Sequence, residues 1–186
     1  MYDRQPLIDK AATALDKKAA IGPDIDLAQF DQAPVAHHYL DDAELLKLPD
    51  EEKQQLLMAG VDVRETERGG TFFQKDTEVV HCKSKQEGIE VIPIREALEK
   101  HDWIKDYYWK LASVDADKYT AASEMNLPNG YVIRALPGAK SIYPIQACLY
   151  LGRQQIQDVH NIIIAEEGAE LHIYSGCTSR AHVGNG

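Results

Sequence analysis

One internal repeat constrains the fold of this chain more than any other feature of its sequence. The segment YVIRALPGAK at residues 131–140 aligns with NIIIAEEGAE at residues 161–170, an offset of about thirty residues. Four identical pairs fall at matching positions: Ile133 and Ile163, Ala135 and Ala165, Gly138 and Gly168, and Ala139 and Ala169. Each copy reads as an apolar strand, a tight turn and a second strand. Such a unit, recurring at this period, is typical of stacked coils in a β-helix or other solenoid, and a generic hairpin signal is the alternative.

The chain before the repeat is predicted to be mainly helical. Apolar residues at helical spacing, with suitable capping residues, indicate helices over residues 4–20, 41–48, 50–59, 95–112 and 115–125. Short strands are expected near residues 71–94. There, β-prone residues predict a hairpin that turns at Lys75–Asp76, followed by a third strand over residues 89–94. We place this third strand at a sheet edge, because Pro93 has no amide hydrogen to donate.

A change of character near residue 128 marks a predicted domain boundary. Asn129–Gly130 is a strong turn signal, and helical patterns give way to strands after it. Residues 1–128 are therefore expected to form a mainly helical region, and residues 129–186 a strand-rich one.

Two strands of this second region carry different burial patterns. Apolar and polar residues alternate over residues 143–151, which predicts a strand with one buried side. The run at residues 161–165 is apolar without alternation, which predicts a strand covered on both sides.

Composition and charge exclude several classes of function. The chain has 186 residues, and 44% of them are hydrophobic, which is enough to build a core. Its formal net charge of −10 argues against a nucleic-acid partner, because no basic stripe is available to neutralise phosphates. No apolar run is long enough to span a membrane, and no signal peptide is visible. The sequence predicts a cytoplasmic protein without membrane or nucleic-acid partners.

The three cysteines point to free thiols. Cys82, Cys148 and Cys177 are far apart and form no Cys-x-x-Cys motif, which excludes a structural zinc ribbon and disfavours a disulfide framework. Free thiols fit a reducing compartment. Neighbouring residues on a strand face opposite sides, so His81 and Cys82 are not expected to form a metal pair.

Cys177 is the candidate functional residue. If its strand is regular, Cys177 shares a face with Leu171 and Ile173. This position favours the interpretation that Cys177 is a small apolar side chain buried in the core. The other interpretation is a thiolate that carries sulfur or binds iron, which needs a nearby cation or metal to lower its pKa. Arg180, His172 and His182 are near in sequence, and Cys177 and His172 are the candidate metal ligands. The residues alone leave both interpretations open.

A longer segment carries a family resemblance. Residues 160–179, HNIIIAEEGAELHIYSGCTS, together with DKYTAAS at 117–123, NGYVIRALPGAK at 129–140 and YPIQ at 143–146, form a collinear pattern. This pattern resembles the SufB/SufD family of iron–sulfur cluster assembly scaffolds, and it is most similar to the archaeal-type branch. The resemblance covers roughly residues 70–186.

The resemblance implies a fold and a function. The expected fold class is α+β: an N-terminal helical region with a small β hairpin, followed by the first coils of a right-handed parallel β-helix in a truncated chain. The implied function is a non-enzymatic scaffold for a transient iron–sulfur cluster. Its implied partners are the ABC-type ATPase SufC and another SufB/SufD-type subunit. A homodimer is a further possibility. Cys177 matches a position where SufB-type members carry a cysteine implicated in sulfur handling.

Two departures from the family pattern bear on this expectation. The cluster-assembly residues and the ATPase-binding region of the family lie mostly in a C-terminal half that this sequence lacks. Leu149 and Leu151 stand where SufB members tend to carry polar residues.

Three other functions compete with the scaffold hypothesis. The main alternative is a non-catalytic interaction module that has no cluster chemistry of its own and uses the aromatic helix at 95–112 and exposed β edges. A nucleotide enzyme is disfavoured, because the segment around Lys140 lacks the glycines of a phosphate loop. A carbohydrate-active enzyme would need paired carboxylates across a groove, and Glu166–Glu167 reads as a solvated turn. We therefore predict no enzymatic activity.

Overall fold

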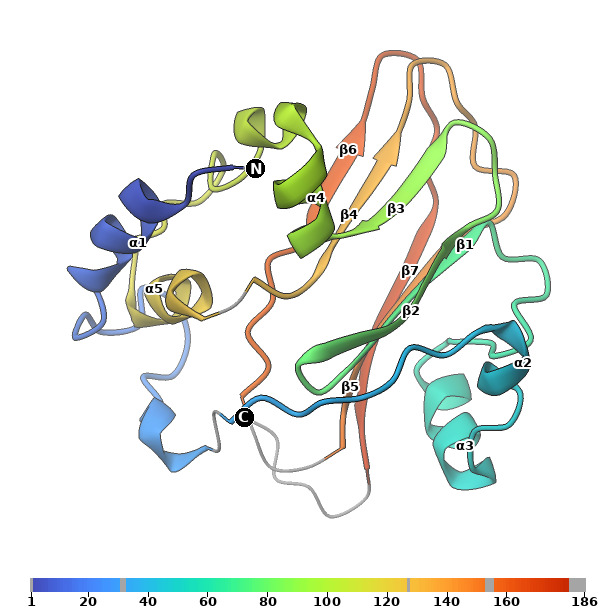
Figure 1. Cartoon of the computed structure of the whole chain (residues 1–186), viewed down its shortest axis with the longest axis horizontal. Coiled ribbons are helices and arrows are strands. Elements are labelled where there is room, and N and C mark those ends of the chain that lie inside the picture. The colour runs from blue at the N-terminus through green and yellow to red at the C-terminus, as the bar shows by residue number, and fades with distance from the viewer. Residues whose placement is uncertain (1, 31–32, 127, 153–155, 181–186) are drawn as a thin grey trace.

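The computed structural model describes residues 2–30, 33–126, 128–152 and 156–180, which form two mixed β-sheets with helices on both sides (Figure 1). The four-stranded sheet has the order β2-β1-β5-β7 and the three-stranded sheet the order β3-β4-β6. The strands are β1 (Gly70–Lys75), β2 (Glu78–Ser84), β3 (Ile89–Pro93), β4 (Tyr131–Ala135), β5 (Ile145–Leu151), β6 (Ile162–Ala165) and β7 (Ile173–Ser179). The helices are α1 (Gln5–Ala12), η1 (Leu27–Gln29), α2 (Asp42–Leu45), α3 (Asp50–Met58), α4 (Ile94–Lys100), η2 (Asp102–Asp106) and α5 (Lys118–Met125).

Three apolar clusters pack against the faces of the two sheets. Side chains of β1, β3, β4 and β5 meet between the two sheets, and Phe72 and Ile133 are fully buried there. The outer face of the four-stranded sheet is covered by α2 and α3, where Leu56 packs with Phe73 and Cys148. On the opposite side of the molecule, α4 and η2 cover the outer face of the three-stranded sheet (Figure 1). Such burial of both faces explains why most of these strands are rich in apolar residues.

The predicted hairpin is confirmed, and so is the position of the third strand. β1 and β2 pair antiparallel, and the turn between them begins at Asp76, whose φ of 53° is left-handed. β3 lies at the edge of its sheet and pairs with β4 on one side only. Pro93 ends β3 and precedes α4, where its missing amide donor costs nothing.

The predicted β-helix is wrong. The repeat does reflect parallel pairing, because β4 and β6 pair in parallel with Ile133 opposite Ile163, the offset seen in the sequence. However, β2 pairs antiparallel with β1 and β3 antiparallel with β4, so both sheets are mixed. The described residues therefore form a mixed α/β fold without a solenoid. Residues 181–186 lie outside the described residues. The predicted boundary near residue 128 stays a prediction, and β1 pairs with β5 across it.

The predicted helix at residues 95–112 is also wrong in its extent. α4 ends at Lys100, because His101 is extended, with φ −121° and ψ 111°, and the chain continues as the short η2. The apolar pattern persists through this break because η2 still packs Ile104 against the same core as α4. No helix among the described residues is both long and apolar enough to cross a membrane.

Two predicted burial patterns differ from the structure. β5 is buried on both faces rather than one, because Cys148 and Tyr150 pack against α2 and α3 and Gln146 bonds to the backbone of Asp62 in the loop after α3. β6 is not covered on both sides. Ile163 is 56% exposed, because β6 is the edge of its sheet in the described chain.

Candidate functional site

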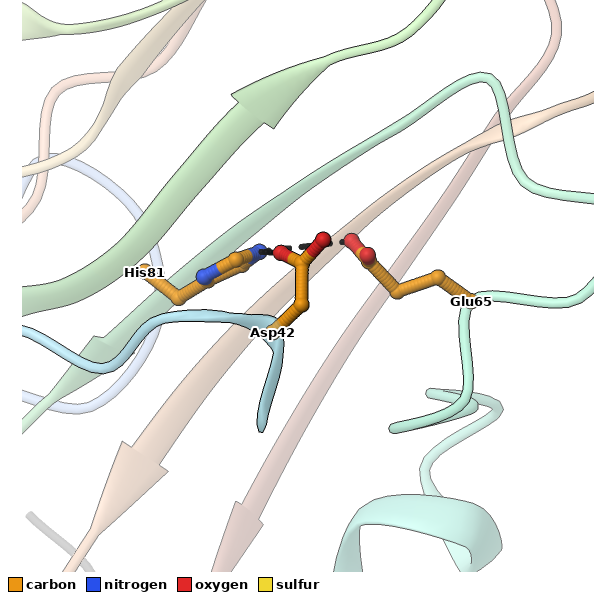
Figure 2. A group of neighbouring side chains, drawn as sticks. All are labelled: Asp42, Glu65 and His81. Atoms are coloured by element: carbon orange, nitrogen blue, oxygen red, sulfur yellow. Dashed lines mark hydrogen bonds and ion pairs between the residues drawn. The ribbon is translucent and has the colours of Figure 1, made fainter. Parts of the chain in front are cut away.

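Among the described residues, three side chains from distant parts of the sequence meet at the outer edge of the four-stranded sheet: Asp42, Glu65 and His81 (Figure 2). Asp42 is the first residue of α2, which begins there because Asp41 and Glu44 form a capping box. Glu65 belongs to the loop between α3 and β1. His81 lies on β2. One potential ligand atom from each of the three lies within 4.8 Å of the other two.

His81 is held in one orientation by the backbone. Its side chain is 2% exposed, and its Nδ1 donates a hydrogen bond of 2.9 Å to the carbonyl oxygen of Leu40. The amide of Leu40 in turn donates to the carbonyl of Val80, which fixes this segment against β2. As a result, Nε2 points at the two carboxylates. It lies 3.3 Å from Oε1 of Glu65 and 4.0 Å from Oδ1 of Asp42.

Glu65 is a buried carboxylate surrounded by donors. Its side chain is 3% exposed. Oε2 forms an ion pair of 2.6 Å with Lys85, and Oε1 accepts a hydrogen bond from the hydroxyl of Thr71. Burial by itself raises the pKa of Glu65, but hydrogen bonds from His81, Lys85 and Thr71 outweigh it and lower the pKa to about 2. Glu65 is therefore ionised at every physiological pH.

Asp42 closes the cluster on the solvent side. Its side chain is 53% exposed, and Lys83 pairs with Oδ2, the oxygen that points away from His81. Burial lowers the pKa of His81, whereas the hydrogen bonds with Glu65 and Leu40 and the charges of Glu65 and Asp42 raise it, and the net effect is a raised pKa. The arrangement thus favours a positive charge between Nε2 and the two inner carboxylate oxygens.

The structure places Cys177 and His172 at opposite ends of β7. Cys177 is exposed, so it is not the small buried hydrophobe that the sequence favoured. It pairs in register with Leu149, and β7 is the sheet edge in the described chain, which leaves the thiol uncovered. His172 is exposed and precedes β7. Five residues of extended chain span about 16 Å, so the described structure does not bring the two side chains together. Their role in metal or sulfur binding stays a prediction.

The other two thiols differ from Cys177. Burial raises the pKa of Cys82, which is half-buried, and of Cys148, which is fully buried, to about 12 in each case. A thiol with such a pKa stays protonated at neutral pH and is a poor nucleophile and metal ligand. Cys177 is thus the accessible thiol of the three.

Known proteins of similar sequence define the family. An iron–sulfur cluster assembly SufBD family protein of Methanothermobacter thermautotrophicus is 41% identical over 188 residues, which covers 95% of this chain. A protein of the same description from Archaeoglobus fulgidus is 46% identical over 132 residues, or 71% of this chain. The chain is a homologue of the SufBD family proteins. The resemblance read from residues 117–179 is confirmed.

This SufBD homologue spans about half the length of the curated relatives it matches. The aligned part is 46% of the Methanothermobacter protein and 36% of the Archaeoglobus protein. A more distant relative, the SufBD family protein of Pyrococcus horikoshii, is 29% identical over 71% of this chain and 31% of its own length. No family model matches the chain.

Sequence reasoning missed the Asp42–Glu65–His81 cluster of this SufBD homologue. It considered His81 only beside Cys82, and the structure agrees that these two side chains face opposite ways, since Cys82 packs between the sheets. The three members of the cluster are separated by many residues and form no motif. Only an alignment or the folded structure could have brought them together.

Proposed function

We propose that this SufBD homologue acts in iron–sulfur cluster assembly as a non-enzymatic scaffold component that holds a cluster or its sulfur transiently. The names of its curated relatives describe cluster assembly, and this supports the general role. One observation on this chain carries the proposal further: all three cysteines lie among the described residues, and Cys177 alone of them is exposed.

The chemistry of the three thiols supports Cys177 as the residue that receives sulfur or iron. The thiolate is the form that binds iron or attacks sulfur. With a pKa of about 12, Cys82 and Cys148 are thiolates in roughly one molecule in a hundred thousand at pH 7. Cys177 also lies on a sheet edge, where a partner molecule can reach it.

The proposed partners are a SufC-type ABC ATPase and another SufB/SufD-type subunit, with self-association as a further option. Support comes from two of the four strands that are sheet edges in the described chain, β6 and β7, which carry exposed Ile163 and Tyr174. Unpaired strand edges are ready templates for pairing with another chain. Three free thiols support a reducing compartment, and we propose the cytoplasm.

The test is anaerobic reconstitution with ferrous iron and sulfide, read by visible absorption. We expect a cluster band in the unmodified chain and its loss in Cys177→Ala. The matched control is Cys82→Ser, which keeps a donor for the carbonyl of Val91 that the Cys82 thiol contacts at 3.3 Å, and which should keep the band. A band that survives in Cys177→Ala, or is lost equally in both variants, would refute the assignment to Cys177.

A second candidate is an interaction module without cluster chemistry. A groove of about 980 Å³ between η2, α5 and β6 favours it, because Trp109, fully exposed Leu111 and Ile163 line this groove. This second function is supported if neither the unmodified chain nor the cysteine variants take up iron, while the chain still binds a SufB/SufD-type subunit in a pull-down.

A further inference from the structure

We propose that Asp42, Glu65 and His81 form a binding site for one divalent first-row transition-metal ion. The site is distinct from Cys177, and it rests on the geometry of the N-terminal half alone. Its failure or success is therefore independent of the proposed role in cluster assembly.

Two distances between the ligand atoms are close to those found around a single shared ion, and all three atoms lie within 4.8 Å of one another. Ligand atoms bound to zinc at about 2.0–2.2 Å lie about 3.4 Å apart when they subtend a tetrahedral angle. Nε2 of His81 and Oε1 of Glu65 are 3.3 Å apart, and Nε2 and Oδ1 of Asp42 are 4.0 Å apart. A charge-assisted hydrogen bond between the same groups is shorter, at about 2.7–2.9 Å. The contact of 3.3 Å is a long hydrogen bond, and its length leaves room for an ion in place of the shared proton.

The orientation of His81 directs its metal-binding nitrogen toward the two carboxylates. Because Nδ1 donates its proton to the carbonyl of Leu40, neutral His81 carries its lone pair on Nε2. That lone pair faces the two inner carboxylate oxygens, so a divalent ion can take the place that a proton on Nε2 holds in the contact with Glu65. Metal-binding histidines commonly donate their other nitrogen to a backbone carbonyl in this way, which fixes the tautomer and the ring.

The two lysines support the site without filling it. Lys83 and Lys85 bind the outer oxygens, Oδ2 of Asp42 and Oε2 of Glu65, and both inner oxygens still face His81. Carboxylates that bind metals are held by donors of this kind on their free oxygens. Thr71 adds a further hydrogen bond to Oε1 of Glu65, which fixes this buried carboxylate.

The ligand set indicates the class of ion. One imidazole nitrogen and two carboxylate oxygens suit zinc, iron or cobalt in the divalent state better than calcium, which takes oxygen ligands only. Glu65 and His81 are buried, whereas Asp42 is 53% exposed, so an ion can enter past Asp42 and keep a water ligand on that side. β2 and β7 are the two opposite edges of the four-stranded sheet, so this site and Cys177 lie on different edge strands.

The experiment measures zinc and cobalt binding in the Cys177→Ala background, which removes the exposed thiol as a competing ligand. After treatment with a chelator, zinc affinity is measured by competition with a chromophoric chelator, and cobalt binding by visible absorption. We expect one zinc ion per chain and a cobalt spectrum of nitrogen–oxygen coordination. Asp42→Asn and His81→Gln should each weaken zinc binding at least about tenfold and reduce the cobalt band.

Two control variants match these changes. Asp50→Asn removes an exposed carboxylate that, like Asp42, opens a helix and pairs with a lysine. His38→Gln removes an exposed histidine beside Glu44. Both should keep the unmodified affinity. Absence of binding, or equal affinity in Asp42→Asn and Asp50→Asn, overturns the proposal. If circular dichroism shows that His81→Gln is unfolded, the surface substitution Asp42→Asn decides alone.

Discussion

His160 gives this fold a measurable sensitivity to acid. Its ring stacks on Tyr108 with centroids 4.8 Å apart and lies against Trp109 with centroids 4.3 Å apart. Nδ1 is buried and has no hydrogen-bond partner within the described residues. A charged imidazole in this position would lose its hydration without a compensating acceptor. Burial accordingly lowers the pKa of His160 from 6.5 to about 4, against a smaller opposing effect of Glu124.

The size and sign of the change in folding stability with pH follow from proton linkage. Between pH 6.5 and pH 4 the unfolded chain protonates this histidine and the folded chain does not. The unfolded state binds more protons in that window, so stability is full above pH 6.5 and falls as the pH drops toward 4. The difference between the two pKa values corresponds to a loss of about 3 kcal/mol, because each pKa unit is worth about 1.4 kcal/mol.

The assay is urea unfolding, followed by circular dichroism, at several pH values between 7 and 4. The variant His160→Phe keeps a ring in the aromatic stack and cannot be protonated. We expect the free energy of unfolding of the natural chain to fall by about 3 kcal/mol more than that of His160→Phe over this range. His172→Phe, at an exposed position, should follow the natural chain. Parallel curves for the natural chain and His160→Phe would refute the reasoning.

Two further predictions concern packing in each half of the fold. Glu124 is fully buried and accepts hydrogen bonds from Arg4 at 2.9 Å and from the indole of Trp109 at 2.7 Å. Glu124→Gln should lower the free energy of urea unfolding by about 3 kcal/mol, because Arg4 loses its charged partner, and a loss below about 1 kcal/mol would contradict this. A Cβ on Gly176 would lie 2.3 Å from the carbonyl oxygen of Ala59, so Gly176→Ala should push β7 away from α3. Hydrogen exchange should then become faster in β7 and stay unchanged in β3, and unchanged exchange in β7 would count against this contact.

Local and short-range features of the fold could be predicted from the sequence. The hairpin of β1 and β2 follows from two β-prone runs around a turn at Asp76, and Pro93 placed β3 at an edge. The repeat at an offset of thirty correctly indicated which residues pair, with Ile133 opposite Ile163. These features depend on neighbouring residues or on a repeated pattern, both of which are visible in one sequence.

The arrangement of the sheets could not be predicted in the same way. The repeat predicts parallel pairing between its own two copies and carries no information on the strands beside them. β2 and β3 add antiparallel edges to these strands, which makes both sheets mixed and overturns the β-helix. Likewise, an unbroken apolar stripe over residues 95–112 hid the break at His101, because both sides of the break face the same core.

The sequence by itself determined the family resemblance and which residues of the two repeat copies pair. It also identified Cys177 as the candidate residue for binding sulfur or iron. Only the tertiary structure decided that Cys177 is exposed while Cys82 and Cys148 are not, because exposure depends on which strand lies at a sheet edge. It also brought Asp42 and Glu65 to His81. Charges that are distant in sequence interact only when folding brings them within a few ångströms and excludes water, so no local pattern records such a site.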